Sequence, residues 1–234
     1  MHLETLWNGV QLWQHDAQFR LSTDSVACAW FSGFAKHARI ADLGCGSGAI
    51  ALMLLASNPT LHLTGIELQP DAAAAARKNA EENAVQLDVI EGDLRQIRTL
   101  LPAGSMDGVI SNPPYFPVGS GKTAEGPLGR ARSEETCTLS QLVDAAAWLL
   151  RWDGKFVLVH RPERLADLIW ELRSRKLEPK RLRFVRHRAD RAVSLVLLEA
   201  RKGGKPGLEL EPDLVLFDEH NHETEEYKTM YHRV

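Results

Sequence analysis

The stretch Asp42-Leu43-Gly44-Cys45-Gly46-Ser47-Gly48 decides the expected fold, because it places three glycines between two apolar runs. Residues 39–43 have the pattern of a buried strand, and residues 48–57 have that of a helix. Glycines at such a junction let the chain turn tightly and let a ligand approach the main chain. The stretch therefore predicts an α/β fold with a ligand-binding loop after its first strand.

Short apolar runs and helical patterns alternate through the rest of the chain, and we find no internal repeat. Strands are predicted at 39–43, 61–67, 87–91, 107–111, 155–160, 180–187 and 194–200, and helices at 48–57, 71–83, 139–151 and 162–175. Alternating β and α units predict a mostly parallel sheet with helices on both faces. The last two strands have only a short link, which cannot make a parallel crossover, so we expect that pair to be antiparallel.

The two ends and one internal segment are expected to lie outside this sheet. The predicted parts are a small β-hairpin (5–12 and 19–22), a helix (23–36) capped by Ser22 or Thr23, and a long mobile loop (117–135). We therefore divide the chain into an N-terminal extension (1–38), a central domain (39–202) and an acidic C-terminal tail (203–234).

The composition is that of a globular protein, since 44% of the 234 residues are hydrophobic and 25% are charged. No apolar run approaches the roughly 20 residues that cross a bilayer, and residues 1–10 lack the basic start of a signal peptide. Cys28, Cys45 and Cys137 are far apart and odd in number. We therefore expect reduced thiols in the cytoplasm, with no membrane contact and no metal site.

Charge is unevenly distributed, although the net charge is only -3. Residues 172–191 contain nine Lys or Arg and two acidic residues, whereas residues 207–234 contain eight acidic residues and two basic ones. A basic stretch of this kind can bind RNA phosphates, and Lys180, Arg181 and Arg183 are its candidate contacts. The alternative is a solvated edge strand followed by a solvated tail.

Acidic residues at strand ends indicate what the glycine loop binds. A carboxylate at Asp42, before the glycines, suits the cationic methionine end of S-adenosylmethionine (SAM) and would repel a pyrophosphate. Glu67 ends the second predicted strand, where it can accept both hydroxyls of a ribose. Asp93 follows the third, where it can accept the amine of an adenine. The glycine spacing also fits a nicotinamide or flavin fingerprint, which stays an alternative.

A second motif, Ser111-Asn112-Pro113-Pro114-Tyr115-Phe116, closes the fourth predicted strand. Open α/β sheets bind ligands at the carboxyl ends of their strands, so the motif should face the cofactor. The two prolines fix the backbone, which makes the carbonyl of Pro113 and the side-chain oxygen of Asn112 rigid acceptors. Tyr115 offers a face on which a planar base can stack, worth about 1–3 kcal/mol, and Phe116 can line the same slot.

Two fixed acceptors suit methyl transfer to an exocyclic amine. The lone pair of that nitrogen is delocalised, and acceptors on both hydrogens favour a pyramidal nitrogen with its lone pair directed at the methyl group. No general base is needed before transfer, because the proton leaves the cationic product afterwards. The alternative is an ordinary turn with an aromatic residue packed on it.

Together these motifs resemble the class I amino-methyltransferases, which act on N6 of adenine, N2 of guanine or a glutamine amide. Phe19-Arg20-Leu21-Ser22-Thr23-Asp24-Ser25 and Ala131-Arg132-Ser133-Glu134 resemble, more narrowly, the bacterial tRNA1(Val) adenine N6-methyltransferases. The resemblance covers nearly the whole chain, most firmly residues 15–160. The acidic tail is more similar to the Gram-positive branch of that family.

This resemblance implies a Rossmann-like, seven-stranded, mostly parallel sheet with an antiparallel last strand, SAM as the methyl donor, and an adenine beside the anticodon of tRNA as the target. It implies a lid at residues 19–25. The implied cofactor residues are Thr23, Asp24, Asp42, Gly44, Gly46, Gly48, Glu67, Leu68, Asp93, Leu94 and Asn112, and the implied target-site residues are Asn112, Pro113, Tyr115 and Phe116.

Other functions stay open at this point. The same chemistry could act on guanine N2 of rRNA, adenine N6 of DNA or glutamine N5 of a protein, and the chain could also be a non-catalytic RNA-binding module that holds SAM. Glutamine methyltransferases usually carry a helical N-terminal substrate domain, for which residues 1–38 leave no room.

Overall fold

The computed structural model describes residues 2–14, 21–113 and 137–231. The strands are β1 His2–Thr5, β2 Gln11–Gln14, β3 Arg39–Leu43, β4 His62–Glu67, β5 Leu87–Glu91, β6 Met106–Ser111, β7 Leu150–His160, β8 Leu177–Arg188, β9 Val193–Lys202, β10 Glu209–Leu210 and β11 Leu214–Phe217. The helices are α1 Thr23–Ser32, α2 Ala49–Ser57, α3 Pro70–Glu82, α4 Ile97–Leu100, α6 Leu139–Leu149, α7 Leu165–Ser174 and α8 Glu225–Met230, with 3-10 turns η1 Trp7–Gly9, η2 Leu94–Gln96 and η3 Pro162–Arg164.

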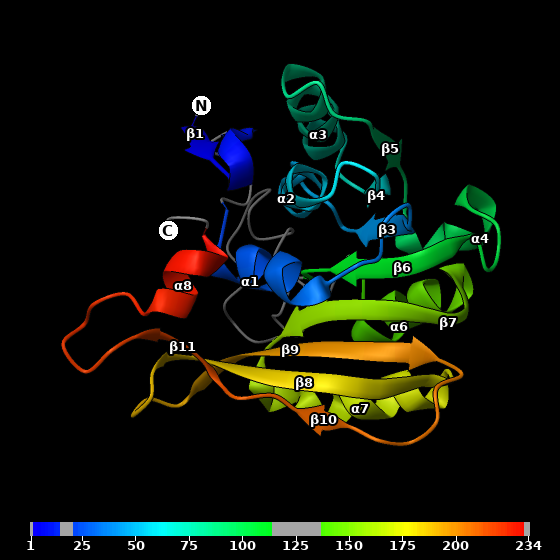
Figure 1. Ribbon diagram of the computed structural model, residues 1–234. Helices are drawn as coiled ribbons and strands as arrows, with labels where there is room; N and C mark the ends of the chain where they lie inside the picture. The colour runs from blue at the N-terminus through cyan, green and yellow to red at the C-terminus, as the bar shows by residue number, and fades with distance from the viewer. Residues whose placement is uncertain (1, 15–20, 114–136, 232–234) are drawn as a thin grey trace, which may run out of the picture.

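The central sheet has the order β5-β4-β3-β6-β7-β9-β8, and Figure 1 shows the strands stacked in that order. Strands β3 to β7 pair in parallel, whereas β9 runs antiparallel to both of its neighbours, which confirms the expected sheet and its antiparallel strand. Within the described residues the sheet has nine strands rather than seven. The additional two, β10 and β11, come from the tail and pair with the outer edge of β8.

The order of the strands places a reversal of direction beside β3. From β3 the chain builds outward through β4 and β5, and then returns to the other side of β3 with β6. In an open α/β sheet, such a reversal leaves a crevice at the carboxyl ends of the two diverging strands. The glycine loop follows β3 and the Asn-Pro motif follows β6, so both sequence motifs lie at this point.

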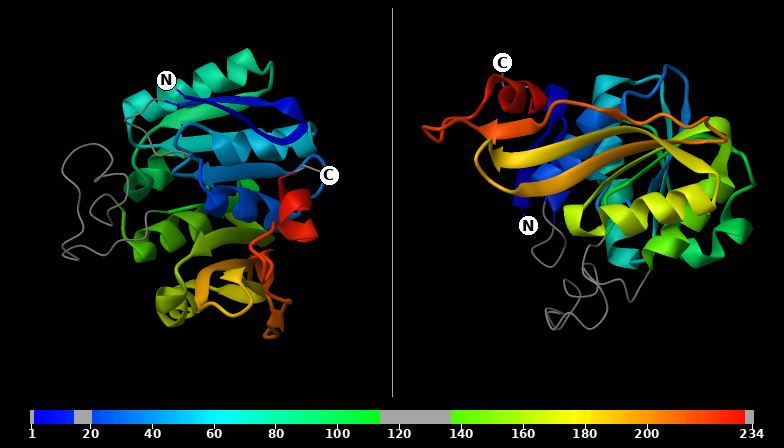
Figure 2. Two further views of the ribbon diagram at one scale, coloured as in Figure 1. Left: turned by 90° about the vertical axis from the view of Figure 1, so that its left-hand side faces the viewer. Right: turned by 90° about the horizontal axis from the view of Figure 1, so that it is seen from below.

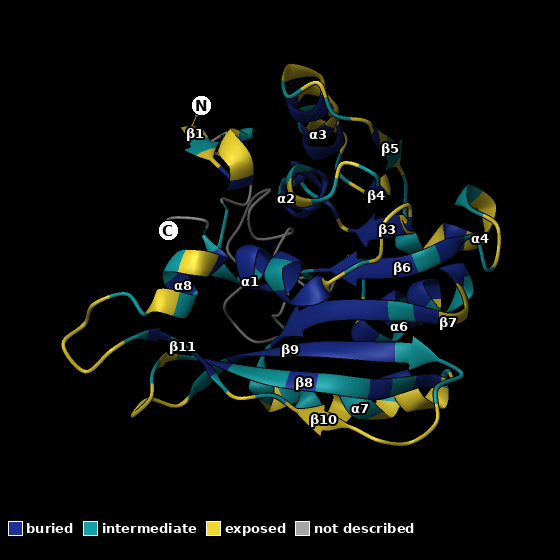
Figure 3. Cartoon of the chain, viewed as in Figure 1, coloured by how far each residue is buried: buried dark blue, intermediate teal, exposed yellow. Residues whose placement is uncertain are grey.

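The alternation of side chains along each strand covers both faces of the sheet. On β7, Val157 and Val159 pack with α1 and α2, whereas Phe156 and Leu158 pack with α6 and α7. All four side chains are fully buried, as expected for a sheet covered by helices on both sides. Figure 3 shows this buried centre, with exposed residues on the tail loops and on the outer side of α3.

The N-terminal hairpin exists, but its strands lie earlier than predicted. β1 pairs with β2 around a turn in which Asn8 and Gly9 both adopt positive φ angles. The predicted strand 5–12 ran through this turn, which an Asn-Gly pair favours, and was therefore wrong. The predicted partner 19–22 lies partly outside the described residues. Helix α1 begins at Thr23 as expected but ends at Ser32, because Gly33 is left-handed (φ 51°).

The C-terminal tail packs back on the domain. β11 pairs with β8, and α8 packs against α1, so Figure 2 shows the red α8 beside the blue α1. The basic and acidic segments partly neutralise one another, because Arg181, Arg183 and Arg186 of β8 pair with Glu211, Glu226 and Asp213. Three of the nine basic residues in the stretch 172–191 are thus paired with the tail. In the described part of the chain, no helix is long and apolar enough to span a membrane.

Candidate active site

The glycine loop between β3 and α2 owes its shape to residues that reach left-handed backbone angles. Gly44, Gly46 and Gly48 have φ values of 73°, 55° and 87°, a region that disfavours residues with a Cβ atom. The backbone nitrogens of Gly44 and Cys45 both donate to the carbonyl of Ile66, at 2.8 and 3.2 Å. These bonds hold the loop against the end of β4.

Glu67 joins the loop to the end of β4 through its carboxylate. One oxygen accepts from the backbone nitrogen of Gly46 and the other from that of Gln69, both at 2.9 Å. Glu67 is buried, with 7% of its surface exposed. A carboxylate has about four lone-pair sites, so these two bonds leave acceptor capacity for ribose hydroxyls.

Asp42 presents an unsatisfied carboxyl oxygen beneath the loop. The side chain is 1% exposed, and its Oδ2 has no hydrogen-bond partner among the described residues. Burial, reinforced by the carboxylate of Glu67, raises the pKa of Asp42 from 3.8 to about 7. The hydroxyl of Ser22, before α1, is a second buried atom without a hydrogen bond in the described structure. The buried Oδ2 of Asp42 fits the ammonium of a bound amino acid, as the methionine end of SAM would provide.

We expect binding of S-adenosylhomocysteine, which has the same amino-acid end as SAM, to depend on pH through Asp42. Below pH 7 the free protein holds this carboxyl mainly protonated, and an ammonium favours the ionised form, so binding releases a proton. The affinity should fall about tenfold between pH 8 and pH 6. Calorimetry in buffers of different ionisation enthalpy measures both the affinity and the released proton.

Asp42→Asn is the matched variant for this titration. It should bind the ligand more weakly and with a flat pH profile over the same interval. Because its pKa is raised in the folded state, Asp42 stabilises the fold at low pH. This contribution to the free energy of unfolding is lost as the pH rises through 7. The variant should therefore melt higher than the wild type at pH 8 when no ligand is present. A wild-type affinity that is constant from pH 6 to pH 8 would contradict the assignment.

Asp93 and two leucines occupy the ends of β4 and β5. Asp93 caps η2 and binds Arg95, whose side-chain nitrogens approach both carboxylate oxygens, at 2.8 Å from Nε to Oδ2. The hydrogen bond from Arg95 lowers the pKa of Asp93. Leu68 is 41% exposed and Leu94 is half-buried, so both apolar side chains are accessible at this edge. The role of Asp93 and the leucines in holding adenine stays a prediction.

Asn112 follows β6 immediately beside the glycine loop. Asp42 of β3 pairs with Ile110 of β6, and continuing this register places Asn112 alongside Gly44. The hydroxyl of Ser111 donates to the carbonyl of Leu43 at 2.7 Å, which fastens the two strand ends together. The structure therefore brings the two sequence motifs into contact.

The remaining predicted target residues are only partly described. Pro113 follows Asn112 and is half-buried. Tyr115, Phe116, the predicted loop 117–135, and Phe19 and Arg20 of the predicted lid lie outside the described residues. Thr23 and Asp24 start α1, and the hydroxyl of Tyr231 approaches that of Thr23 at 3.4 Å.

Sequence reasoning missed two polar residues that support this site. The amide nitrogen of Gln14 donates to the hydroxyl of Ser47 in the glycine loop, and the Gln14 side-chain oxygen accepts from the backbone of Leu21. The hydroxyl of Ser25 accepts a hydrogen bond from Nδ2 of Asn112 at 2.9 Å. Ser25 belonged to the segment singled out by resemblance, but no local signal indicated its partner.

The basic residues proposed for RNA lie away from this point. β8 is separated from β6 by β9 and β7. Arg181 pairs with Glu199 and Glu211, and Arg183 pairs with Glu226, whereas Lys180 donates to the carbonyl of Lys205. Their contact with RNA stays a prediction, and an RNA phosphate would have to displace the carboxylates of the tail.

Known proteins are similar to this chain in sequence and in fold. The family described as methyltransferase small domain matches residues 24–169. The tRNA1(Val) (adenine(37)-N6)-methyltransferase of Porphyromonas gingivalis is 31% identical over 196 residues, which are 80% of this chain and 76% of that protein. The protein of the same name from Dickeya chrysanthemi is 32% identical over 197 residues, covering 82% of this chain and 76% of its own.

A solved structure agrees with the fold. The predicted O-methyltransferase Atu636 from Agrobacterium tumefaciens superposes with a TM-score of 0.75 at 22% identity, over 90% of this chain and 96% of that one. The family match spans more than half of the chain, including the glycine loop, Glu67 and Asn112. The chain therefore belongs to the methyltransferase small domain family and is a SAM-dependent methyltransferase related to the bacterial tRNA1(Val) adenine N6-methyltransferases.

Proposed function

We propose that this enzyme methylates N6 of an adenine in tRNA, at the position beside the anticodon. The observation that carries the proposal is the placement of Asn112 at the end of β6, next to the glycine loop that ends β3. The names of the relatives from P. gingivalis and D. chrysanthemi supply the acceptor, since both are tRNA1(Val) adenine N6-methyltransferases. A tRNA acceptor makes the cytoplasm the site of action.

The residues of the chain account for the chemistry of this transfer. Bound SAM supplies a methyl group on a sulfonium, which makes that methyl electrophilic. Asn112 and the carbonyl of Pro113 accept the two hydrogens of the adenine amine and direct its lone pair away from the ring. Asp42 would hold the ammonium of the donor, and Glu67 would hold its ribose. The nitrogen would form its bond to the methyl carbon as the sulfur–carbon bond of the donor breaks, which leaves S-adenosylhomocysteine, and the cationic product would then lose a proton to water.

A labelling experiment with four acceptors tests the acceptor and the reaction together. The protein is incubated with SAM labelled on its methyl group and with total tRNA, bulk rRNA, DNA or a bacterial protein extract. We expect label in tRNA, and nuclease digestion followed by mass spectrometry should identify N6-methyladenosine. The Asn112→Ala variant provides the blank.

Each other outcome contradicts the proposal in its own way. Label in rRNA, DNA or protein alone would keep the reaction and reject the tRNA acceptor. Binding of S-adenosylhomocysteine without transfer to any acceptor would point to a non-catalytic module. Binding of NADH in place of S-adenosylhomocysteine would reject the cofactor as well.

A further inference from the structure

We propose that Ser25 is a positioning residue for methyl transfer, because its hydroxyl holds the side-chain amide of Asn112. The two residues are 87 positions apart in sequence, and their hydrogen bond measures 2.9 Å. Ser25 is only 8% exposed, in the first turn of α1, and Asn112 is half-buried, so the bond is partly shielded from water. The inference rests on the proposed function, in which Asn112 touches the target amine.

The orientation of the Asn112 amide decides whether it attracts or repels that amine. Its oxygen accepts a hydrogen bond and its NH2 group donates, although the two ends have nearly the same shape. Rotation by 180° about the last side-chain torsion would therefore set a donor against the hydrogens of the adenine amine. The bond to Ser25 fixes the NH2 group on the side of α1. The oxygen of the same amide therefore points in the opposite direction from Ser25.

Both ends of this hydrogen bond are fixed by the surrounding structure. The backbone nitrogen of Ser25 donates to the carbonyl of Ser22 at 3.1 Å, which closes the first turn of α1. One turn later, the thiol of Cys28 approaches the carbonyl of Ser111 at 3.6 Å, directly before Asn112. Helix α1 is thus attached to the end of β6 at two successive points.

Ser32 shows what an ordinary buried serine does on the same helix. It is 1% exposed, and its hydroxyl donates to the carbonyl of Ala29 at 2.7 Å, three residues earlier in α1. This bond stays within the helix, whereas that of Ser25 crosses to another element. Ser32→Ala therefore removes a buried hydroxyl from α1 without touching Asn112, which makes it the matched control for Ser25→Ala.

The test is a double-mutant cycle on the acceptor that the wild type labels. Rates, KM values and affinities for S-adenosylhomocysteine are measured for the wild type, Ser25→Ala, Ser25→Thr, Ser32→Ala, Asn112→Ala, and the double variant Ser25→Ala with Asn112→Ala. We expect Ser25→Ala to lower kcat about tenfold, as the loss of one hydrogen bond implies, with an unchanged KM and cofactor affinity and a loss of melting temperature similar to that of Ser32→Ala. Ser25→Thr keeps the hydroxyl and should recover most of the rate. Ser25→Ala should have no further effect once Asn112 is alanine, because the two residues act as one unit.

Three results would overturn the inference. The first is a wild-type kcat in Ser25→Ala. The second is an equal loss of rate when Ser25→Ala is introduced into the wild type and into Asn112→Ala. The third is a loss of rate that Ser25→Thr does not recover and that Ser32→Ala also shows. Failure of the proposed function is recognised separately, because the wild type itself would then transfer label to no acceptor.

Discussion

Replacing Asn112 with alanine is expected to lower kcat for methyl transfer by about 10²–10³-fold, the usual effect of removing one preorganised acceptor or donor from an active site. The side chain lies at the end of β6 beside the glycine loop, and its amide is held by Ser25. Because alanine removes the oxygen proposed to accept one hydrogen of the target amine, the lone pair of the nitrogen would no longer be directed at the methyl group. Single-turnover rates with labelled SAM measure the chemical step directly.

Cofactor binding separates this effect from general damage. Asn112→Ala should retain the thermal shift that S-adenosylhomocysteine induces, because Asp42 and Glu67, the residues proposed to hold the cofactor, are unchanged. Asn112→Asp keeps a side-chain oxygen as an acceptor, and the hydroxyl of Ser25 can donate to the new carboxylate. We therefore expect Asn112→Asp to keep more activity than Asn112→Ala. A kcat for Asn112→Ala within a few-fold of the wild-type value would remove Asn112 from the chemistry.

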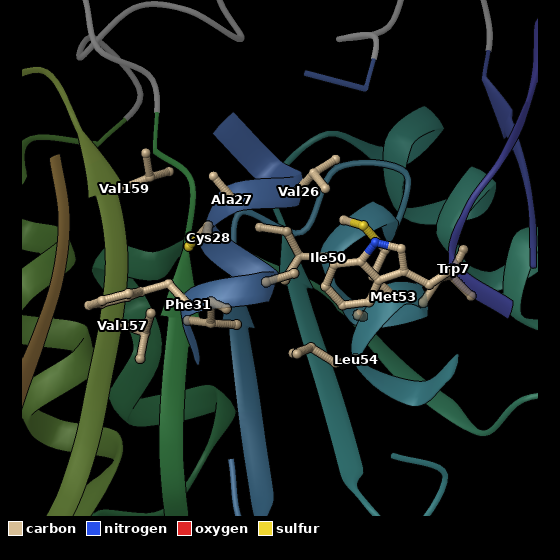
Figure 4. Close-up of a cluster of buried hydrophobic side chains, with 14 of the residues drawn as sticks. Trp7, Val26, Ala27, Cys28, Phe31, Ile50, Met53, Leu54, Val157 and Val159 are labelled. Atoms are coloured by element: carbon tan, nitrogen blue, oxygen red, sulfur yellow. The ribbon is translucent and has the colours of Figure 1, made fainter. Parts of the chain in front are cut away.

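Replacing Trp7 with alanine is expected to lower the free energy of unfolding by about 3–5 kcal/mol, the usual loss for a large buried aromatic residue. The indole is 4% exposed and stands edge-on to Trp30, with ring centroids 6.5 Å apart. Figure 4 shows it reaching from the N-terminal segment toward Ile50 and Met53 of α2. Its Nε1 donates to the carbonyl of Met230 at 2.8 Å, which ties both ends of the chain together.

Denaturant unfolding of three variants separates burial from the hydrogen bond. Trp7→Phe retains most of the apolar surface and loses the N–H group, so it should fall between the wild type and Trp7→Ala. Trp170→Ala is the control, because this tryptophan of α7 is 67% exposed and its loss should change stability little. Equal free energies of unfolding for Trp7→Ala and Trp170→Ala would contradict the stabilising role of the packing between the N-terminal segment and α2.

The amino-acid sequence determined those features that depend on local patterns. Alternating apolar runs indicated the parallel sheet, and the glycines of residues 44–48 indicated the loop after β3, where their φ angles are indeed positive. Since parallel strands end at the same edge of a sheet, the sequence alone also predicted that Glu67 and Asn112 lie near that loop. The Asn8-Gly9 pair also favours a turn by its residue types alone, and this turn, rather than a continuous strand 5–12, joins the two strands of the hairpin.

Only the tertiary structure decided which distant side chains pair. The sequence contains a basic segment and an acidic tail, but their mutual neutralisation depends on β11 and α8 folding back along β8 and α1. Likewise, the raised pKa of Asp42 arises from burial, and the contact of Ser25 with Asn112 arises from the docking of α1 on β6. Many polar residues in the chain are able to form hydrogen bonds and ion pairs with one another. Which of them do so depends on the packing of helices and strands, because packing determines which side chains come within bonding distance.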